Sequence, residues 1–522
     1  MTLNLTKLYI SNWFYLAAIL FAVSLPFSIA LISISGGLLL FTSLLQLNKE
    51  QLRKTFNERK LFLFPIGIFF IYLVWLIFTN DWKWASYDLR KNMAYLILPA
   101  AFLLGPKLSK TQYKNILYVF SFAVVLSSII TLVNFYLKED HSILNAQHYG
   151  FMHHIRFSLQ IDFSLLIFVQ LLFEQRKLLN IYQKTGIVLA VGILISFLVW
   201  HQSLTGIITL LITIFIALGN WFFKHTSPKI KVIGAFVLVL SVLLPAAYLY
   251  YAVNRYYTFD SIDQNQLSEL TVEGNKYSHD LKKKEVENGH YVWLFVCDKE
   301  LEEEWNKRSD LKYNTLDKFG YNVKYTLIRY LASKNLRKDA AGVQALTESD
   351  VSNIENGISN YLLADIGLSL YPRIYVSIWE LDSYYRTGNA NHRSLAQRIE
   401  YSKAAFSIIQ DNFWLGVGTG NWKKAYRDFY VSSNSQMAPE RYGNVHNQYL
   451  NYMVKFGLIG LVLILFFLFY PVYISKEYRN TLFLLFLVIM IVGNFGDANF
   501  ETHTGSNFFV FFYCLFLTPK ST

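Results

Sequence analysis

An imidazole stands directly in front of an apolar run in the C-terminal part of the chain. His446 precedes a stretch of mostly apolar residues that begins at 447 and is long enough for a membrane helix. Because imidazole titrates near neutral pH, a histidine at the mouth of such a helix can take a proton from a hydroxyl group. The alternative is an interfacial histidine that caps the helix or bonds a backbone carbonyl. His446 is the candidate general base.

A second candidate is an arginine in a polar segment before this histidine. The spacing of Ser394 and Gln397 predicts a capping box, and so a helix with Arg398 near its first turn. Free backbone N–H groups and the guanidinium would then act on one ligand, and the planar fork of arginine suits phosphate oxygens. The alternative is a surface ion pair with an acid such as Glu380 or Asp382.

Other cations stand at the ends of apolar segments. Arg156 opens one of these segments within HHIRFSLQ, and Arg90 and Lys91 precede another. Each of them either binds an anionic ligand or reaches the lipid headgroups. A Gly-x-Gly-x-Gly stretch at Gly416, Gly418 and Gly420 follows no strand and lacks the acidic residue of a dinucleotide site. These glycines predict a tight backbone turn.

No metal or other cofactor is expected. His148, His153 and His154 lie close to Arg156 in sequence, but no cysteine and no i, i+4 histidine pair accompanies them. The two cysteines of the chain lie in unrelated segments and predict neither a disulfide bridge nor a ligand set.

The composition excludes an ordinary soluble protein. Of 522 residues, 53% are hydrophobic and 16% are charged, whereas soluble chains have about a quarter of charged residues. The formal charge of +12 is divided among short clusters between apolar blocks. That pattern predicts membrane topology and does not predict a nucleic-acid partner.

Twelve apolar blocks predict an all-α polytopic membrane protein with about twelve transmembrane helices. We place them at residues 11–26, 28–46, 61–79, 92–105, 115–137, 157–173, 185–200, 204–223, 232–252, 447–473, 480–494 and 506–518. Sixteen Lys and Arg residues fall in the short connections on one side and five on the other. The positive-inside rule then places both termini in the cytoplasm.

The same topology divides the chain into three parts. Residues 1–252 would form helices one to nine, residues 253–446 a large, mostly helical loop domain outside, and residues 447–522 helices ten to twelve. The loop pattern favours helices over strands, and few hairpin signals stand out in it.

The segment 394–460 carries a more specific pattern. It reads SLAQRIEYSKAAFSIIQDNFWLGVGTGNW and, after a polar stretch, NVHNQYLNYMVKFGLIG. This resembles the signature region of the bacterial O-antigen ligase and polymerase superfamily. In that family an Arg-bearing helix leads to a Gly-Val-Gly-x-Gly loop, and a His-Asn pair opens a membrane helix with a Gly-Leu-Ile-Gly motif.

The resemblance implies roles for particular residues. His446 would be the general base, and Arg156 and Arg398 would stabilise a pyrophosphate. The remaining candidates, all for substrate binding, are Arg90, Lys91, Arg393, Asn447, Gly416 and Gly418. Relatives often show Ser-Arg-Gly in the turn that here reads HQSLTG at 201–206, so Arg156 or Arg393 would substitute for the missing arginine.

The resemblance also implies a reaction. A glycan would pass from an undecaprenyl-pyrophosphate donor to a hydroxyl of lipid A core, another glycan or a protein, at the periplasmic face of the bacterial inner membrane, without a metal. A polymerase of repeat units and a protein O-oligosaccharyltransferase share these features. A lipid-linked sugar transporter or flippase is the alternative of another class. Transporters tend to place ionisable groups at mid-membrane and to show repeated halves, whereas the candidate charges here gather at the outer face and no halves repeat.

Overall fold

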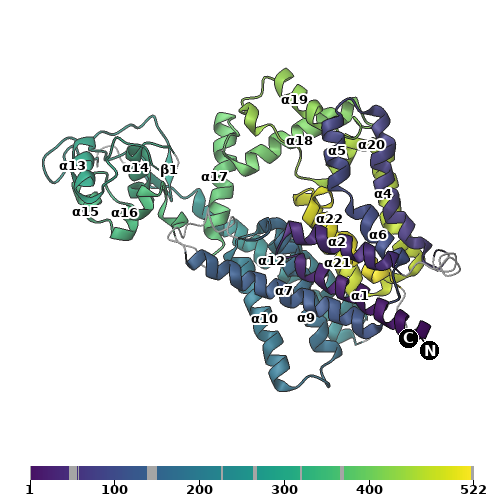
Figure 1. Cartoon of the computed structure of the whole chain (residues 1–522). Helices are drawn as coiled ribbons and strands as arrows, with labels where there is room; N and C mark the ends of the chain where they lie inside the picture. The colour runs from purple at the N-terminus through teal and green to yellow at the C-terminus, as the bar shows by residue number, and fades with distance from the viewer. Residues whose placement is uncertain are drawn as a thin grey trace. The chain divides into compact units, whose positions relative to one another are not determined.

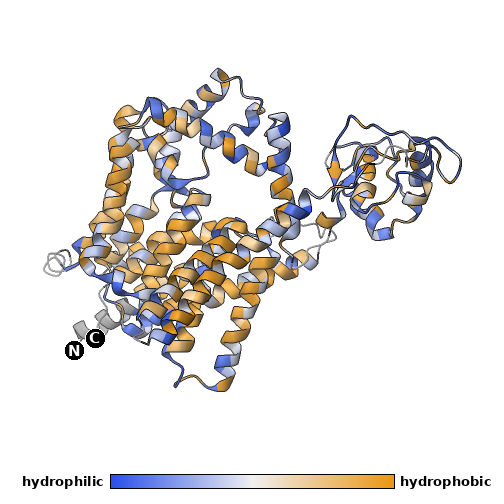
Figure 2. Ribbon diagram, turned by 180° about the vertical axis from the view of Figure 1, so that it is seen from behind, coloured by the Kyte–Doolittle hydropathy of each residue, from blue (hydrophilic) through white to orange (hydrophobic). Residues whose placement is uncertain are grey.

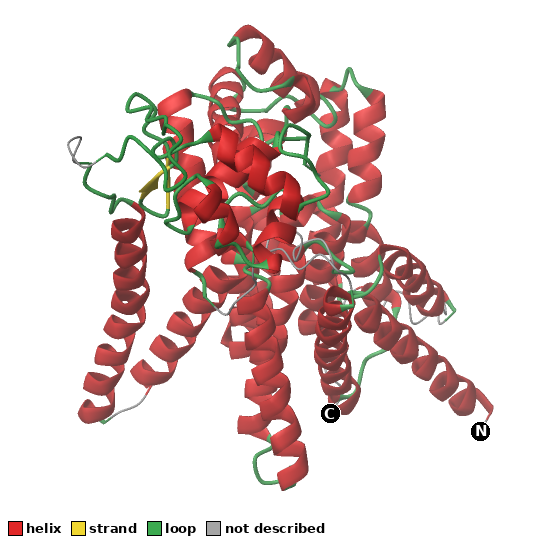
Figure 3. Ribbon diagram, turned by 90° about the vertical axis from the view of Figure 1, so that its left-hand side faces the viewer, coloured by secondary structure: helices red, strands yellow, loops and turns green. Residues whose placement is uncertain are grey.

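The computed structural model describes residues 2–45, 56, 58–137, 150–224, 227–262, 267–317, 320–364 and 369–518, with side chains described from residue 12 onward. Helices make up most of the described chain (Figure 3). The contacts group the chain into two compact units. Unit 1 comprises residues 1–134, 148–238 and 380–522, and unit 2 comprises residues 135–147 and 239–379.

Unit 1 contains most of the apolar helices (Figures 1 and 2). Its helices before the second unit are α1 (Thr2–Ser24), α2 (Ile29–Leu44), α4 (Leu63–Val74), α5 (Trp82–Lys91), α6 (Ala94–Leu104), α7 (Lys110–Tyr136), α9 (His154–Glu174), α10 (Ile181–Trp200), α11 (Leu204–Lys224) and the first part of α12 (Pro228–Tyr256). Its later helices are α18 (Ser394–Asp411), α19 (Trp422–Ser432), α20 (Gln448–Ser475), α21 (Thr481–Gly496) and α22 (His503–Leu517). Five short 3-10 helices lie in the described part of this unit: η1 (Lys60–Phe62), η2 (Trp75–Phe78), η5 (Pro439–Arg441), η6 (Glu477–Arg479) and η7 (Asn499–Glu501).

Each of the twelve predicted apolar blocks falls on one of these helices. Within the described residues, seven helices are long and apolar enough to cross a membrane, and four apolar helices are shorter. The chain is therefore a multi-pass membrane protein, as the hydropathy predicted. The count of twelve crossings stays a prediction, because helices as short as α6 do not span a bilayer by length alone.

The centre of unit 1 is a helix buried along its length. In α22 the run from Thr504 to Leu517 is buried throughout, so no face of it meets lipid. Its aromatic rings pack against rings of neighbouring helices: the centroid of Phe512 lies 4.7 Å from Phe120 of α7 and 4.9 Å from Phe163 of α9. A helix that is apolar on all sides suits this interior position.

Unit 2 is a smaller helical unit with one hairpin. Its elements are β1 (Val286–Glu287), β2 (His290–Tyr291), α13 (Asp298–Arg308), α14 (Val323–Ser333), α15 (Ala340–Gln344), α16 (Glu348–Glu355) and the first part of α17 (Tyr371–Thr387). Trp305 and Leu327 are fully buried in its core. Asn288 and Gly289, both with positive φ, form the turn between the antiparallel strands. This hairpin was not expected from the sequence.

The predicted domain limits are not tested by this grouping and stay predictions. Contacts divide the predicted loop 253–446 at residue 380, because the segment from Glu380 onward groups with unit 1. That segment includes α18, α19 and the residues leading to α20. The part of the loop that makes unit 2 ends at Trp379.

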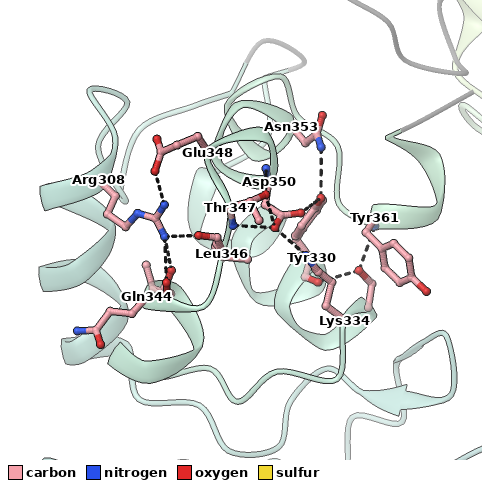
Figure 4. Close-up of polar contacts among 12 residues, drawn as sticks. Arg308, Tyr330, Lys334, Gln344, Leu346, Thr347, Glu348, Asp350, Asn353 and Tyr361 are labelled. Carbon is pink, nitrogen blue, oxygen red and sulfur yellow. Dashed lines mark hydrogen bonds and ion pairs between the residues drawn. The ribbon is translucent and has the colours of Figure 1, made fainter.

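A carboxylate network holds the helices of unit 2 together (Figure 4). Asp350 forms a capping box with Thr347 at the start of α16. It also accepts hydrogen bonds from the hydroxyl of Tyr330 on α14 at 2.6 Å and from Nζ of Lys334, the C-cap residue of that helix, at 2.7 Å. Burial opposes ionisation of this carboxyl, but the bonds from Lys334, Tyr330 and Thr347 outweigh it and lower the pKa of Asp350 to about 2.

We predict that Asp350→Asn loosens the packing of α16 on α14. The substitution removes a charged acceptor and should cost about 1–3 kcal/mol of local stability. Hydrogen–deuterium exchange of the full-length protein in detergent should show faster exchange in α14 and α16. Wild-type protein should show the same change as the pH falls from about 4 toward 2, because a lowered folded-state pKa means that stability is lost on protonation.

The matched control is Asp310→Asn, at an exposed carboxylate of the same unit. It should leave exchange in α14 and α16 unchanged. Equal exchange in wild type and Asp350→Asn would contradict the role given to this network.

Candidate active site

A buried carboxylate joins the two most important predicted site residues. Asp497, just after α21, accepts from Nη2 of Arg156 at 2.7 Å and from Nδ1 of His446 at 3.0 Å. The side chain of Asp497 is 6% exposed, that of Arg156 15% and that of His446 41%. The guanidinium and the imidazole therefore meet on one acid that sequence analysis did not single out.

The charge state of Asp497 follows from its neighbours. Burial opposes its ionisation, but the hydrogen bond from His446, the charge of Arg156 and the backbone N–H of Ala498 outweigh burial, so the pKa of the carboxyl lies well below its ordinary value. An ionised carboxylate only accepts hydrogen bonds, so Nδ1 of His446 is the donor. In the neutral imidazole Nε2 is then the unprotonated nitrogen, which is the form that a general base needs.

Arg398 belongs to the same electrostatic neighbourhood. The pKa of His153, the residue before α9, depends on the charges of Arg398 and of the other site residues. Burial lowers the pKa of His153 to about 4, and the positive charges of Arg156, His446 and Arg398 add to this effect while Asp497 opposes it. Arg156, Arg398 and His446 thus each lower the pKa of His153, and the convergence of the three in one pocket stays a prediction. Their catalytic roles stay predictions.

Two neighbours fix the position of His446. Asn447 caps α20: its side-chain oxygen accepts from the backbone N–H groups of Tyr449 at 3.0 Å and Leu450 at 3.1 Å, and its amide nitrogen donates to the carbonyl of Phe495 at 3.4 Å. The ring of Tyr401 on α18 stacks on His446 with centroids 5.8 Å apart. These contacts support a positioning role for Asn447, and substrate binding by it stays a prediction.

The predicted capping box at Ser394 is wrong. The helix α18 does begin at Ser394, but its N-cap is Arg393 and no side chain of that residue caps it. Instead the carboxylate of Glu380 accepts from the backbone N–H of Leu395 at 2.7 Å. A carboxylate from outside the helix thus takes the place that a bound anion would occupy, and Arg398 lies in the second turn.

The two acids that the sequence offered as ion-pair partners of Arg398 have other partners. Glu380 is engaged with α18, and Asp382 pairs with Arg386 at 2.6 Å. Within the described residues the guanidinium of Arg398 makes no ion pair. Its charge is therefore available to an anionic ligand.

The segment 413–420, which we call the glycine loop, forms hydrogen bonds to the backbone of α20 at a break in that helix. The helix is interrupted at Gly457, where φ is +63° and ψ is −168°. The carbonyls of Val454 and Lys455 accept from the N–H groups of Val417 and Gly418, each at 2.9 Å. On the other side of the break, Leu458 donates to the carbonyl of Phe413 at 2.8 Å and Ile459 to that of Trp414 at 3.2 Å. Backbone groups that the break frees are thus satisfied by another backbone.

This docking explains the glycines. Gly416 has φ +64°, and a Cβ on it would lie 2.5 Å from the backbone of Lys455 and Phe456. Gly418 has φ +93°, and its Cβ would lie 2.8 Å from Phe78. The geometry supports the tight backbone approach expected of this loop. Substrate binding by Gly416 and Gly418 stays a prediction.

A buried ion network stands directly before the break. Lys455 Nζ lies 2.8 Å from Glu501 of η7 and 3.1 Å from Asp88 of α5, and all three side chains are at most 3% exposed. Tyr72 donates to Glu501 at 2.5 Å and Trp422 to Asp88 at 3.0 Å. One lysine thereby ties together α5, α20 and η7. Buried charges in a membrane protein persist only when they are paired.

The remaining predicted cations lie elsewhere. Arg90 and Lys91 end α5, where Nε of Arg90 donates to the carbonyl of Ser86 at 3.3 Å and Lys91 lies over the ring of Tyr87. Neither contacts Asp497 among the residues described. Arg393 donates to the carbonyl of Asn389 in the turn before α18. Substrate binding by these three cations stays a prediction.

The predicted histidine cluster is described only in part. His153 and His154 stack with centroids 4.4 Å apart, and His154 faces His201 at 6.2 Å. His148 lies outside the described residues. In the described part of the chain no group of three His, Cys, Asp or Glu side chains is placed to hold a metal. Metal independence stays a prediction.

Asp497, Asp88, Lys455 and Glu501 were missed by sequence reasoning. A signal existed for two of them: the short connection GDANFE between two apolar blocks holds Asp497 and Glu501. Carboxylates so close to membrane helices are costly unless they are paired, and this makes them functional candidates by default. The pairing with Lys455 has no spacing signature.

The fold and this site define a multi-pass membrane protein with an imidazole, two guanidinium groups and a shared carboxylate at the ends of its helices. Residues 361–465 match the family described as O-antigen ligase. The match spans about a fifth of the chain and holds α18, α19, the glycine loop and His446. The segment 361–465 is therefore similar to the O-antigen ligase family, as the motifs predicted, and the chain is a multi-pass membrane protein. A search of curated proteins finds no match.

We predict that Lys455→Met destabilises the protein strongly. The change leaves Asp88 and Glu501 buried without a cation, and breaking a buried pair in this way costs about 3–5 kcal/mol. The apparent Tm, followed by tryptophan fluorescence in detergent, should fall clearly. The exposed neighbour Lys424→Met should leave the Tm unchanged.

A triple variant separates charge from packing. Combining Lys455→Met with Asp88→Asn and Glu501→Gln removes every charge of the network and should recover most of the lost stability. A wild-type Tm in Lys455→Met, or a triple variant less stable than the single one, would contradict the role of the network.

Proposed function

We propose that the protein transfers a glycan from an undecaprenyl-pyrophosphate donor to an acceptor hydroxyl at the periplasmic face of the bacterial inner membrane, in the manner of an O-antigen ligase. The observation that carries the proposal is the Arg156–Asp497–His446 junction, in which a base and a cation share one carboxylate. The family match and the multi-pass fold support the same reaction class.

The base activates the acceptor. Nε2 of His446 takes the proton of the acceptor hydroxyl, while Nδ1–H keeps its hydrogen bond to Asp497, which stabilises the imidazolium that forms. The oxygen attacks the anomeric carbon as the bond from that carbon to the pyrophosphate oxygen breaks. A single displacement of this kind inverts the anomeric configuration. Lipid pyrophosphate leaves with the bonding electron pair, and no metal takes part.

The arginines stabilise the leaving group. Negative charge develops on the pyrophosphate as the bond breaks, and fixed guanidinium groups that wait for this charge lower the barrier. Arg156 keeps one nitrogen on Asp497, and its Nε–H has no acceptor within the described chain. Arg398 makes no ion pair among these residues. Together they leave more positive than negative charge around Asp497, as a pyrophosphate requires.

Substitution of His446, Arg156 or Arg398 should slow transfer by purified protein in nanodiscs that is supplied with lipid-linked glycan and a free acceptor. His446→Ala should lower kcat about 10²–10⁴-fold, the range for loss of a general base. Arg156→Ala and Arg398→Ala should each lower it about 10²–10³-fold through lost electrostatic stabilisation. Product is quantified by gel and mass spectrometry.

Two matched controls accompany these variants. His392→Asn removes an exposed imidazole near α18, and asparagine tolerates the positive φ of that residue. Arg427→Ala removes an exposed guanidinium from α19. Both should keep full turnover. Full turnover by His446→Ala would remove the base assignment, and absence of transfer by wild-type protein with every acceptor would refute the proposed reaction.

Deletion of the gene in cells identifies the class of acceptor. Deleting the gene should leave long glycan that is attached to no acceptor, because a ligase acts after polymerisation. Gel analysis of the cell glycans measures this outcome. A polymerase would leave glycan of single repeats, and a protein oligosaccharyltransferase would leave unglycosylated protein. An unchanged glycan profile would contradict all three activities.

A further inference from the structure

Unit 2 holds two adjoining cavities that the transfer reaction does not use. Two cavities of about 580 and 440 Å³ share Asp260 and His290 in their walls. The first lies along the last turns of α12 and includes Tyr251, and the second is lined by Arg337 and Lys338. We call the two together the His290 groove. Its combined size suits several sugar rings rather than a single small molecule.

The middle of the groove is held rigidly. The backbone N–H of Asp260 donates to the carbonyl of Gly289 at 2.9 Å, and Nδ1 of His290 lies 2.7 Å from the carboxylate of Asp260. The hairpin turn is anchored in turn, because the side chain of Asn288 donates to the carbonyl of Ser333 at 2.9 Å. The exit of α12 and the hairpin therefore present one preformed wall. Preformed walls lower the entropic cost of binding.

One end of the groove is cationic. Arg337 is exposed, and its guanidinium lies 4.8 Å from the ring centre of Phe295, which holds it over the cavity wall. Lys338 is buried and donates to the carbonyl of Tyr291 at 2.9 Å. Neither cation has a carboxylate in ion-pair contact among the residues described. The carboxylate of Asp260 already faces His290, so net positive charge remains.

The other end is aromatic. Tyr250 and Tyr251 lie at the end of the apolar block 232–252, in the last two turns of α12, which at 29 residues is longer than the about 20 residues that cross a bilayer. Their side chains are exposed by 70% and 56%. Tyrosine rings offer an apolar face together with a polar hydroxyl. Aromatic faces with a few fixed polar groups are the surfaces that bind polyhydroxylated ligands. The second oxygen of Asp260, whose side chain is 52% exposed, provides an acceptor for sugar hydroxyls.

We propose that the His290 groove binds an anionic glycan, with sugar rings on the tyrosines of α12 and a carboxylate or phosphate of the glycan on Arg337 and Lys338. The inference takes the glycan class from the proposed function, and the groove and its charge from unit 2. It gives this unit a task of its own, which is to bind a segment of the glycan.

The test measures binding directly. The glycan is released from the lipid-linked pool of the source cells by mild acid and titrated onto the full-length protein in nanodiscs by microscale thermophoresis. One portion is carboxyl-reduced and another is dephosphorylated with aqueous hydrofluoric acid. Wild-type protein should bind native glycan, and Arg337→Ala should bind it about tenfold more weakly. The control Lys299→Ala, at an exposed cation outside the groove, should bind like wild type.

The treated glycans identify the anionic group. Loss of affinity after carboxyl reduction assigns the cationic end to a carboxylate, and loss after dephosphorylation assigns it to a phosphate. In either case Arg337→Ala should bind the neutralised glycan as wild type does. Unchanged affinity after both treatments, equal binding by wild type and Arg337→Ala, or equal loss in Lys299→Ala overturns the proposal. So does binding of native glycan that vesicles of anionic phospholipid displace.

The two proposals fail separately. Wild-type protein that binds native glycan and transfers nothing would refute the reaction and leave the groove intact. Transfer without any binding of the released glycan would refute the groove and leave the reaction intact.

Discussion

Three stretches of the chain that lie far apart in sequence meet at the carboxylate of Asp497. Without that charge, the guanidinium of Arg156 and the imidazole of His446 would repel each other once the imidazole took a proton. With it, the base has a defined donor nitrogen, and the imidazolium has a counter-ion. The pKa of Asp497 is lowered because its two donors, His446 and Arg156, outweigh the cost of burying the acid.

The helical segment that directly follows the base is short because α20 breaks at Gly457. In a bilayer, backbone groups freed by such a break must find partners inside the protein. Here the glycine loop before α19 provides them, and Lys455 closes the same region with a buried ion network. The glycine-rich segment thus forms backbone hydrogen bonds to α20 on both sides of the break. It holds the segment from His446 to Phe456 against α5 and η7, and so fixes the base relative to Asp497.

A part of the structure could be predicted from the sequence where local interactions determine it, and could not where residues far apart in the sequence determine it. Hydropathy is local, so every apolar block predicted a helix that the structure contains. The family motif predicted that Arg398 and His446 act together. Glu380 replaced the expected cap of α18 because a carboxylate from outside the helix competes with Ser394, and no local spacing shows that. The hairpin of unit 2 did have a local signal, Asn288-Gly289, which the helical pattern of its surroundings obscured.

The central claim is that Asp497 sets the proton position on His446, and the nitrogen-15 chemical shifts of that ring test it most directly. Protein labelled at histidine is measured in detergent at a pH where the ring is neutral, and the signals are assigned by their loss in His446→Ala. We expect a protonated Nδ1 and an unprotonated Nε2 in the wild-type protein, with this preference lost in Asp497→Asn. A wild-type ring protonated at Nε2 would contradict it.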